Sequence, residues 1–482
     1  MLAASATYSY RVRATNTAGD SLYTTTASAT TSAIVGGSGA YIWQTHFGGP
    51  SIANDSATPV GVVVDSTGAS VVLGYLKGQA DFGGGFLTSA GSGDVYVVKR
   101  ASDGSYVWSQ RFGGTGDDRP RGIAIDASGN ILITGYFSGT VSFGGASLTA
   151  GGTSSGFLAK YSATGAHVWS KRLTTGLALD TGDAVAVDGS GNVLVASTLY
   201  GTSDYGGGPL TSSGGQDIVL VKYSATGSYI WSRKIGGANN EWVTSLAADS
   251  TTGEVVAVGN FDGSTDFGAG TVRTAGGTDA FVAKYSSAGA PVWSLHWGST
   301  DADSATDVAI DRLGNVAVTG AFNDNVDFGG GPITNVGGST SADIYLVKLS
   351  PAGLHLWSKG FGNALSNAQA GNGVAFDSAG NVLLTGQIVA LSSAPYTIDF
   401  GGGPITGDGW YNVFLAKFGS AGSYVWAKRY LGGGGNAEGR AIAADGNGNV
   451  IAAGDYDVSE NFGGTTMTSP GGTDTYLVKL GP

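Results

Sequence analysis

The chain has 482 residues, of which 85 are glycine, 41% are hydrophobic and 10% are aromatic. This apolar content excludes an intrinsically disordered chain, and the lack of a triplet glycine period excludes collagen. The net charge of −12 disfavours nucleic acid as a partner, because an acidic chain repels phosphate. Cysteine is absent, and no apolar run approaches the roughly 20 residues of a membrane-spanning helix, so the sequence predicts neither disulfides nor a membrane span.

The N-terminal segment, residues 1–35, does not share the repeat that follows it. Its first part alternates as a strand with the pattern Tyr-x-Tyr-x-Val-x-Ala and then turns at Asn-x-Ala-Gly. This pattern, over residues 6–30, resembles the end of a fibronectin type III domain. Two strands alone are marginally stable in water, so we expect further β-sandwich modules upstream. We interpret residues 1–35 as partial fibronectin type III-like strands followed by a glycine-rich linker.

A sequence repeat about 62 residues long fills residues 36–482. One unit, residues 122–173, contains four short apolar segments at 122–126, 131–137, 157–161 and 167–173, separated by turn signals. Four such strands form one small antiparallel sheet. The repeat is marked by seven regularly spaced tryptophans: Trp43, Trp108, Trp169, Trp231, Trp293, Trp357 and Trp426.

Three further positions recur once in every unit. The first strand ends in an aspartate: Asp65, Asp126, Asp188, Asp249, Asp311, Asp377 and Asp445. The third strand carries a lysine: Lys99, Lys160, Lys222, Lys284, Lys348, Lys417 and Lys479. An aromatic residue precedes a glycine in the segment between the second and third strands: Phe82, Phe143, Tyr205, Phe267, Phe328, Phe400 and Phe462. Because they repeat, we expect the lysines and tryptophans to pack between units, with each ammonium group meeting a repeated carboxylate or carbonyl.

The order of the strands predicts a closed ring. A single sheet of this kind cannot bury both faces, but sheets stacked radially can. The repeats begin with a fourth strand, residues 41–47, and end after a third strand, residues 475–480. The sequence therefore predicts an all-β fold, a seven-bladed β-propeller of four-stranded antiparallel blades over residues 36–482, closed by the N-terminal strand completing the last blade.

Several motifs in residues 41–480 resemble the bacterial SBBP β-propeller repeat family. They include FGGTGDD at residues 112–118, IDASGN at 125–130 and DAFVAK at 279–284, together with Trp293. The resemblance implies a propeller in a secreted or cell-surface protein, alongside adhesive modules. It implies no single activity and no catalytic residues.

An acidic position recurs eight residues before the first-strand aspartate, in the loop that leads into the innermost strand. It holds Asp118, Asp180, Glu241 and Asp303, and Gln369 in the sixth unit. A ring of carboxylates near the channel mouth could bind a metal ion, and Ca²⁺ is the expected cofactor because it takes several oxygen ligands. The alternative is structural, with each side chain accepting backbone N–H groups of its own loop.

Aromatic residues outside the repeat are the candidates for ligand binding: Trp242, Trp297, Trp410 and Tyr411. Aromatic side chains on loops can stack on a sugar or anchor a protein partner. The sixth unit also carries an insertion at residues 387–396, which breaks the symmetry of the ring. Both features direct attention to the places where the repeat is interrupted.

Two functions from different classes remain open. The absence of a catalytic motif favours a non-enzymatic recognition or adhesion module, a monomer that is secreted or on the cell surface and binds a glycan or an extracellular protein through its loops. The alternative is a lyase or hydrolase with its site at the channel mouth, for which Asp118, Asp180 and Asp303 would be the residues to test. That alternative rests on analogy between propellers.

Overall fold

The computed structural model forms two compact units, Met1–Ser38 and Gly39–Pro482, in which every regular element of the described residues is a β-strand. In the first unit, β1 (Thr7–Tyr10) pairs with β4 (Ala27–Thr30), and β2 (Thr15–Asn16) pairs with β3 (Gly19–Asp20). In the second unit the structure describes residues 39–50, 55–174, 180–338, 341–363, 369–389, 396–407, 411–431, 435–470 and 472–482. No helix able to cross a bilayer occurs in the described residues. The fibronectin type III interpretation of residues 6–30 stays a prediction.

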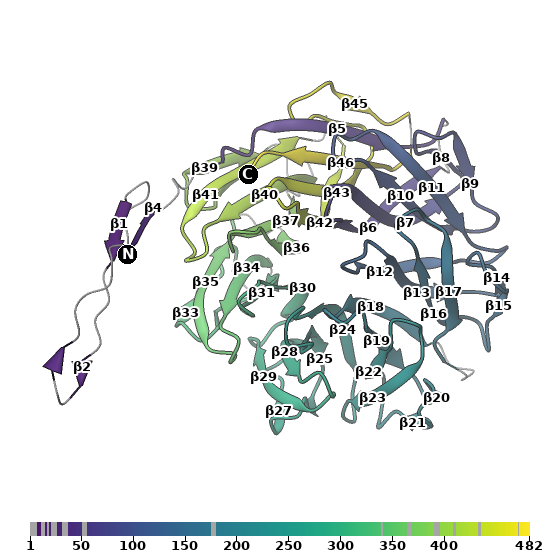
Figure 1. Cartoon of the computed structure of the whole chain (residues 1–482), viewed down its shortest axis with the longest axis horizontal. Coiled ribbons are helices and arrows are strands. Elements are labelled where there is room, and N and C mark those ends of the chain that lie inside the picture. The colour runs from purple at the N-terminus through teal and green to yellow at the C-terminus, as the bar shows by residue number, and fades with distance from the viewer. Residues whose placement is uncertain are drawn as a thin grey trace. The chain divides into compact units, whose positions relative to one another are not determined.

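The second unit contains seven four-stranded antiparallel sheets, which are the blades (Figure 1). From the innermost strand outward, blade one contains β6 (Ser56–Val64), β7 (Ser70–Lys77), β10 (Asp94–Arg100) and β11 (Tyr106–Phe112), and blade two contains β12 (Arg119–Ile125), β13 (Ile131–Phe137), β16 (Ser155–Tyr161) and β17 (His167–Arg172). In the same order, blade three contains β18 (Thr181–Val187), β19 (Val193–Leu199), β22 (Asp217–Tyr223) and β23 (Tyr229–Ile235). Blade four contains β24 (Glu241–Ala248), β25 (Val255–Phe261), β28 (Asp279–Tyr285) and β29 (Pro291–Trp297).

The remaining three blades have the same strand order. Blades five to seven are β30 (Ser304–Ile310), β31 (Val316–Phe322), β34 (Asp343–Leu349), β35 (His355–Phe361); β36 (Gln369–Phe376), β37 (Val382–Val389), β40 (Tyr411–Phe418), β41 (Tyr424–Leu431); and β42 (Ala437–Ala444), β43 (Val450–Tyr456), β46 (Asp474–Leu480), β5 (Tyr41–Phe47). The inner strands contact one another around the ring, β6 against β12 and so on to β42 against β6. The predicted seven-bladed propeller is confirmed.

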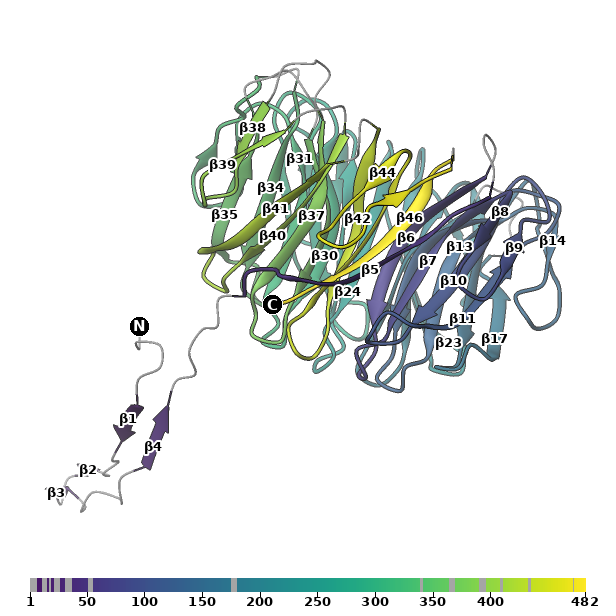
Figure 2. The same cartoon turned by 90° about the horizontal axis from the view of Figure 1, so that it is seen from above.

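Each blade carries a short hairpin between its second and third long strands. Figure 2 shows hairpins of this kind, such as β38–β39 and β8–β9, gathered at one end of the blades. The seven hairpins pair β8 (Gln79–Asp81) with β9 (Phe86–Thr88), β14 (Thr140–Val141) with β15 (Leu148–Thr149), β20 (Thr202–Asp204) with β21 (Pro209–Thr211), β26 (Ser264–Asp266) with β27 (Thr271–Arg273), β32 (Val326–Asp327) with β33 (Pro332–Ile333), β38 (Tyr396–Asp399) with β39 (Pro404–Gly407), and β44 (Ser459–Glu460) with β45 (Met467–Thr468).

The N-terminal strand of the ring completes the last blade, as predicted. In Figure 1 the purple β5 lies beside the yellow β46, and the two strands pair antiparallel with Phe47 opposite Thr475 and Trp43 opposite Lys479. The Gly481 amide donates to the Ala40 carbonyl at 2.6 Å just beyond the paired strands. Pairing of β5 covers the outer edge of β46, so blade seven has the same four strands as its neighbours.

The repeated lysines join neighbouring blades. Lys160 Nζ lies 3.0 Å from the Asp126 carboxylate of its own blade and 3.4 Å from the Ala225 carbonyl of the next blade. The Trp169 indole N–H donates to that same carbonyl at 3.2 Å. The repeated lysine pairs with the first-strand aspartate in five of the other blades: Lys99–Asp65, Lys222–Asp188, Lys348–Asp311, Lys417–Asp377 and Lys479–Asp445. In blade four Lys284 pairs instead with Glu254, in the turn after the inner strand. The predicted structural role of these lysines is confirmed.

The first-strand aspartates also shape their turns. Asp126 Oδ1 accepts the backbone N–H groups of Ser128 and Asn130 at 3.0 and 2.9 Å. Gly129 has a φ of 78°, a conformation that side chains with a Cβ rarely adopt. The turn is therefore an aspartate-stabilised hairpin, and it directs the chain from the inner strand to the second strand.

Candidate functional site

Every inner strand contains a β-bulge at the same place. The register shifts between Pro59 and Gly61 in blade one, between Pro120 and Gly122 in blade two, and at the equivalent position in all the other blades. The extra residue lies five positions before the first-strand aspartate. It differs from blade to blade: Val60, Arg121, Asp183, Thr244, Thr306, Asn372 and Arg440. A bulge changes the direction in which a side chain points, so these seven residues have surroundings that differ from those of the other repeat positions. We call these seven residues the bulge ring.

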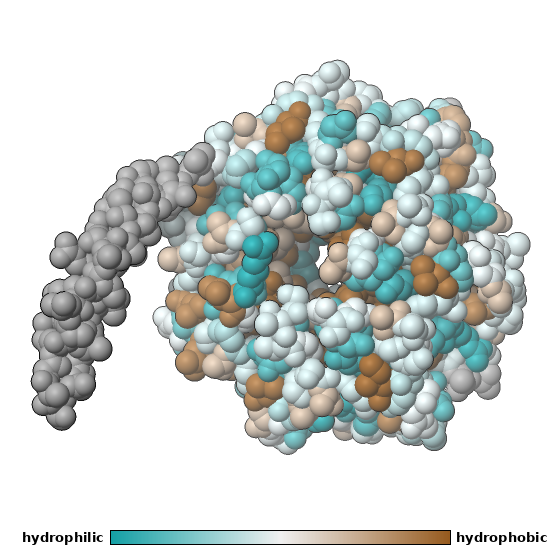
Figure 3. Space-filling view, in the orientation of Figure 1, coloured by the Kyte–Doolittle hydropathy of each residue, from teal (hydrophilic) through white to brown (hydrophobic). Residues whose placement is uncertain are grey.

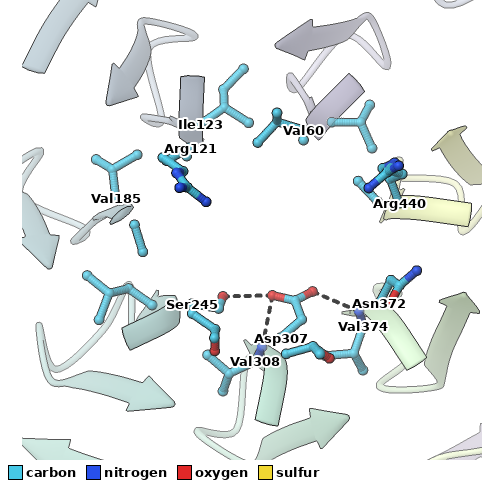
Figure 4. Close-up of a pocket in the computed structure, with 18 of the residues that line it drawn as sticks. Val60, Arg121, Ile123, Val185, Ser245, Asp307, Val308, Asn372, Val374 and Arg440 are labelled. Atoms are coloured by element: carbon cyan, nitrogen blue, oxygen red, sulfur yellow. Dashed lines mark hydrogen bonds between the residues drawn. The ribbon is translucent and has the colours of Figure 1, made fainter. Parts of the chain in front are cut away.

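The bulge ring borders a central cavity of about 250 Å³ (Figure 4). Six of its residues, all except Asp183, belong to the lining. An aliphatic residue two positions further along each inner strand also lines the cavity: Val62, Ile123, Val185, Leu246, Val308, Val374 and Ile442. The space-filling view shows the hollow at the centre of the ring (Figure 3). Polar side chains that vary between blades thus lie next to a uniform aliphatic layer.

One wall of the cavity, on blades four to six, is tied together by hydrogen bonds. Asp307 accepts the Ser245 hydroxyl at 2.7 Å and the Val374 amide at 2.8 Å, so it bridges three blades (Figure 4). Burial raises the pKa of Asp307 to about 6. The Thr244 hydroxyl donates to the Ala305 carbonyl of the next blade at 2.8 Å. These groups hold inner strands together.

The same pattern continues from blade six to blade seven. The Asn372 amide group donates to the Gly439 carbonyl of blade seven at 2.9 Å. Arg440 then forms an ion pair with Glu438 at 2.9 Å and a second one with Asp455. The charge of Arg440 is therefore balanced within its own blade.

The opposite wall, on blades one and two, leaves a cation exposed to the cavity. Arg121 is exposed, lies 5.7 Å from the Tyr136 ring centre and forms no hydrogen bond or ion pair with a described residue. Figure 4 shows its side chain directed into the cavity. Burial of the Asp183 carboxyl raises its pKa, although the positive charge of Arg121 acts in the opposite direction. Arg121 is thus the charged group of this wall that is available to a ligand.

A second arginine of the same strand, Arg119, is not among the described residues that line the cavity. It lies 4.7 Å from the Tyr75 ring centre of blade one and pairs with Asp117 at 2.7 Å. The Tyr75 hydroxyl donates to Asp117 at 2.7 Å. Burial and this carboxylate raise the pKa of Tyr75 to about 12. These three side chains therefore bind one another where blades one and two meet.

The predicted metal ligands are buried in four separate blades, and none of them lines the cavity among the residues described. Asp118 accepts the Gly114 and Ser138 amides at 2.7 and 3.0 Å. Asp303 accepts the Ser299 and Asn323 amides at 2.5 and 2.8 Å. Burial raises the pKa of both carboxyls.

The other two members of the predicted set have similar surroundings. Asp180 accepts the Tyr200 amide at 3.2 Å and the Ser203 hydroxyl. Glu241 accepts the Gly237 amide at 3.1 Å, and burial raises its pKa to about 7. Within the described ranges no three His, Asp or Glu side chains converge as a metal site. The Ca²⁺ interpretation stays a prediction, and the backbone contacts are those of the structural alternative.

The predicted ligand-binding aromatics do not form one site. The expectation that Trp297 lies on a loop is wrong: it is the last residue of β29, is 6% exposed and packs 5.4 Å from the Phe328 ring. Trp242 is half-buried in β24, and its indole N–H donates to Gln216 of the loop before the third strand of blade three. Tyr411 begins β40 and is half-buried opposite Val389. Trp410 lies outside the described residues.

Residues 390–395, the centre of the blade-six insertion, also lie outside the described residues. The bulge ring itself was missed by the sequence analysis. The residue five positions before each first-strand aspartate varies between blades, but the residues on either side of it vary as well, so the sequence alone does not single it out. Only the strand register shows that this variable residue faces the cavity.

Comparison with known proteins agrees with the fold. Residues 107–136 match the family model described as a β-propeller repeat, SBBP. An uncharacterised WD repeat-containing protein of Acanthamoeba polyphaga mimivirus is 23% identical over 84% of this chain and 33% of its own length. The regulatory protein FlaEY of Caulobacter vibrioides is 28% identical over 39% of this chain and 19% of its own length. The chain thus spans a third or less of these curated relatives.

Solved structures align with this chain at low similarity. A puromycin hydrolase aligns with a TM-score of 0.44 and 11% identity over 89% of this chain and 56% of that chain. A polysaccharide lyase active on ulvan aligns with a TM-score of 0.43 and 11% identity over 88% of this chain and 97% of that chain. At these values the alignments carry no argument about activity.

Proposed function

We propose that the chain is a non-enzymatic recognition module of a secreted or cell-surface bacterial protein, and that it binds a glycan at the channel mouth beside Arg121. The observation that carries this proposal is the contrast between the repeated scaffold and the bulge ring. Lysine, tryptophan and aspartate side chains that recur in all blades are engaged between or within blades. The side chains that vary between blades border the central cavity.

The chemistry of the mouth supports binding of a hydroxyl-rich ligand. Arg121 offers N–H donors that no described residue occupies, and Thr244, Thr306 and Asn372 add polar side chains to the lining of the cavity. Charge-assisted hydrogen bonds such as those that Arg121 can form are stronger than neutral ones. Donors and acceptors of this kind suit the recognition of hydroxyl groups.

A protein ligand is the second candidate, and the fold favours it. A propeller-repeat fold with a WD repeat-containing relative indicates a protein-interaction module. The channel mouth would then receive a loop of the partner. We also propose that the chain is a monomer, so its mass in analytical ultracentrifugation should equal the chain mass of 48.1 kDa.

A polysaccharide and cell-envelope array tests the proposal. We expect the full chain to bind at least one polysaccharide, and Arg121→Ala to weaken that binding about tenfold through loss of a charged hydrogen bond. Arg273→Ala, which removes an exposed arginine from the outer hairpin of blade four, is the matched control and should bind as the unaltered chain does. Binding of an envelope protein alone, lost in Arg121→Ala, would favour the second candidate. Equal binding by both variants would contradict the assigned site.

A further inference from the structure

Blade five departs from the repeat at the end of the ring opposite the predicted metal-ligand loops. Each inner strand begins after such a loop and ends at the aspartate turn, so the aspartate turns lie at the other end of the channel. Two exposed residues follow the aspartate in each turn: Ser66-Thr67, Ala127-Ser128, Gly189-Ser190, Ser250-Thr251, Arg312-Leu313, Ser378-Ala379 and Gly446-Asn447. Six blades hold small or polar residues there, whereas blade five holds a cation and an exposed leucine.

The second turn of the same blade departs in the same way. The residue directly before the fourth strand is alanine or serine in six blades: Ala40, Ser105, Ala166, Ser228, Ala290 and Ser423. In blade five it is Leu354, which is 68% exposed, and Leu313 of the first turn is 79% exposed. We call Arg312, Leu313 and Leu354 the blade-five patch.

The two turns that carry the patch are in contact and rigid. A Cβ placed on Gly314 would lie 3.3 Å from Pro351, so the turn after β30 packs against the turn before β35. The Pro351 carbonyl accepts Lys284 Nζ at 3.1 Å and the Trp293 indole N–H at 3.0 Å, both from blade four. A preorganised surface of this kind loses little conformational entropy when a partner binds.

The positive charge of Arg312 has no counterpart within the described chain. The neighbouring Asp311 pairs with Lys348 at 3.3 Å, and Arg312 forms no hydrogen bond or ion pair with a described residue. Arg312 also borders a second cavity of about 250 Å³, between blades five, six and seven, whose lining combines Ile310 and Phe376 with three aspartates that are paired with lysines: Asp311, Asp377 and Asp445. An arginine without an ion-pair partner in the described chain, beside exposed leucines, resembles the composition of an interaction hot spot.

We propose that the blade-five patch docks a protein partner through a short aliphatic segment that carries an acidic side chain. The acidic group pairs with Arg312, and an aliphatic side chain of the partner enters the cavity beside Phe376. The charge of the chain, −12, repels a strongly acidic surface, so a segment with one acidic residue among aliphatic ones is the better match. This surface is distinct from the channel mouth of Arg121, and the two proposals stand or fall separately.

Selection from a random 12-residue peptide library against the immobilised full chain tests the proposal. We expect enriched peptides to combine Asp or Glu with Leu, Ile or Val, and their affinity to fall about tenfold in Arg312→Ser and in Leu313→Ser. Both substitutions introduce the serine found at these positions in other blades, so the fold should be retained. Val107→Ser removes an apolar side chain of blade one that is 46% exposed, and Arg121→Ala removes the cavity cation; neither should change the affinity.

Three results of the peptide experiment would overturn the proposal. The first is that no peptide is enriched, and the second is that the enriched peptides lack an acidic residue. The third is that Arg312→Ser and Leu313→Ser bind the peptides as well as the unaltered chain does. Arg312→Glu gives an independent check, because it should select peptides with Lys or Arg in place of Asp or Glu. Loss of polysaccharide binding in Arg312→Ser would assign the patch to a glycan and would also overturn the proposal.

Discussion

At the scale of single residues, the same side chain often serves two blades at once. Lys160 pairs with an aspartate of its own blade and reaches a carbonyl of the next one, where it meets the Trp169 indole. Both charged partners are almost fully buried, with side-chain exposures of 5% and 8%. A buried ion pair adds modest net stability, but removing one partner leaves a buried charge without compensation.

Lys160→Met should therefore destabilise the propeller by about 3 kcal/mol, because Asp126 remains buried without its cation. The shift of the urea unfolding midpoint measures this effect. The double substitution Lys160→Met with Asp126→Asn should recover part of the loss, since the charge is removed together with its partner. A midpoint equal to that of the unaltered chain in the single variant would show that the pair carries no structural role.

Sequence reasoning identified these residues because they recur seven times, and recurrence points to the scaffold. It misjudged Trp297 because a tryptophan there replaces a residue such as Phe47 or Phe112 at the regular core position that ends the fourth strand. It missed Arg121 because the direction of that side chain depends on the bulge, and a bulge is defined by the pairing between strands. Periodicity in the sequence does not contain that information.

At the scale of elements, the loops before the inner strands are held by their own acidic residues. Both oxygens of Asp118 accept backbone amides, and the same is true of Asp303. The carboxylates thereby satisfy amide groups that would otherwise be buried without partners.

The closure of the ring could be predicted from the order of the strands in the sequence. The repeats begin with a fourth strand and end after a third strand, and these two strands together complete blade seven.

Removal of divalent cations tests the role of these loops. We expect EDTA to leave the Tm unchanged, because both carboxylate oxygens of Asp118 and of Asp303 already accept backbone amides. Addition of Ca²⁺ in the millimolar range should likewise leave it unchanged. Differential scanning fluorimetry with and without the ion measures both effects, and stabilisation by Ca²⁺ that EDTA reverses would support the calcium interpretation instead.

At the scale of the whole molecule, buried carboxyls of two kinds set the dependence of stability on pH. Burial raises the pKa of Asp279 and Asp343 to about 6 and that of Asp474 to about 7. The lysine-paired aspartates, such as Asp126 and Asp188, have lowered pKa values because of their hydrogen bonds and the lysine charge, which outweigh the opposing effect of burial. The contributions of these two groups of carboxyls to the stability of the fold change in opposite directions as the pH changes.

The sign of each contribution follows from linkage. A carboxyl with a raised pKa in the fold stabilises it below about pH 4 and loses that contribution as the pH rises toward 6 or 7. A carboxyl with a lowered pKa stabilises the fold above about pH 4 and loses that contribution in acid. We therefore predict that the Tm is highest near about pH 4 and falls as the pH rises to about 7. A Tm that rises steadily from pH 4 to pH 8 would contradict this assignment.

The central claim is that the repeated residues build the propeller, while the residues of the bulge ring bind the ligand. Arg121→Val tests it most directly, because valine is the residue that blade one carries at the same position, Val60. The measurement is a calorimetric titration of the unaltered chain and of Arg121→Val with the polysaccharide that binds best on the array, together with the Tm of both proteins. The account predicts equal Tm values and an affinity about tenfold weaker in the variant. An unchanged affinity at equal Tm would contradict it.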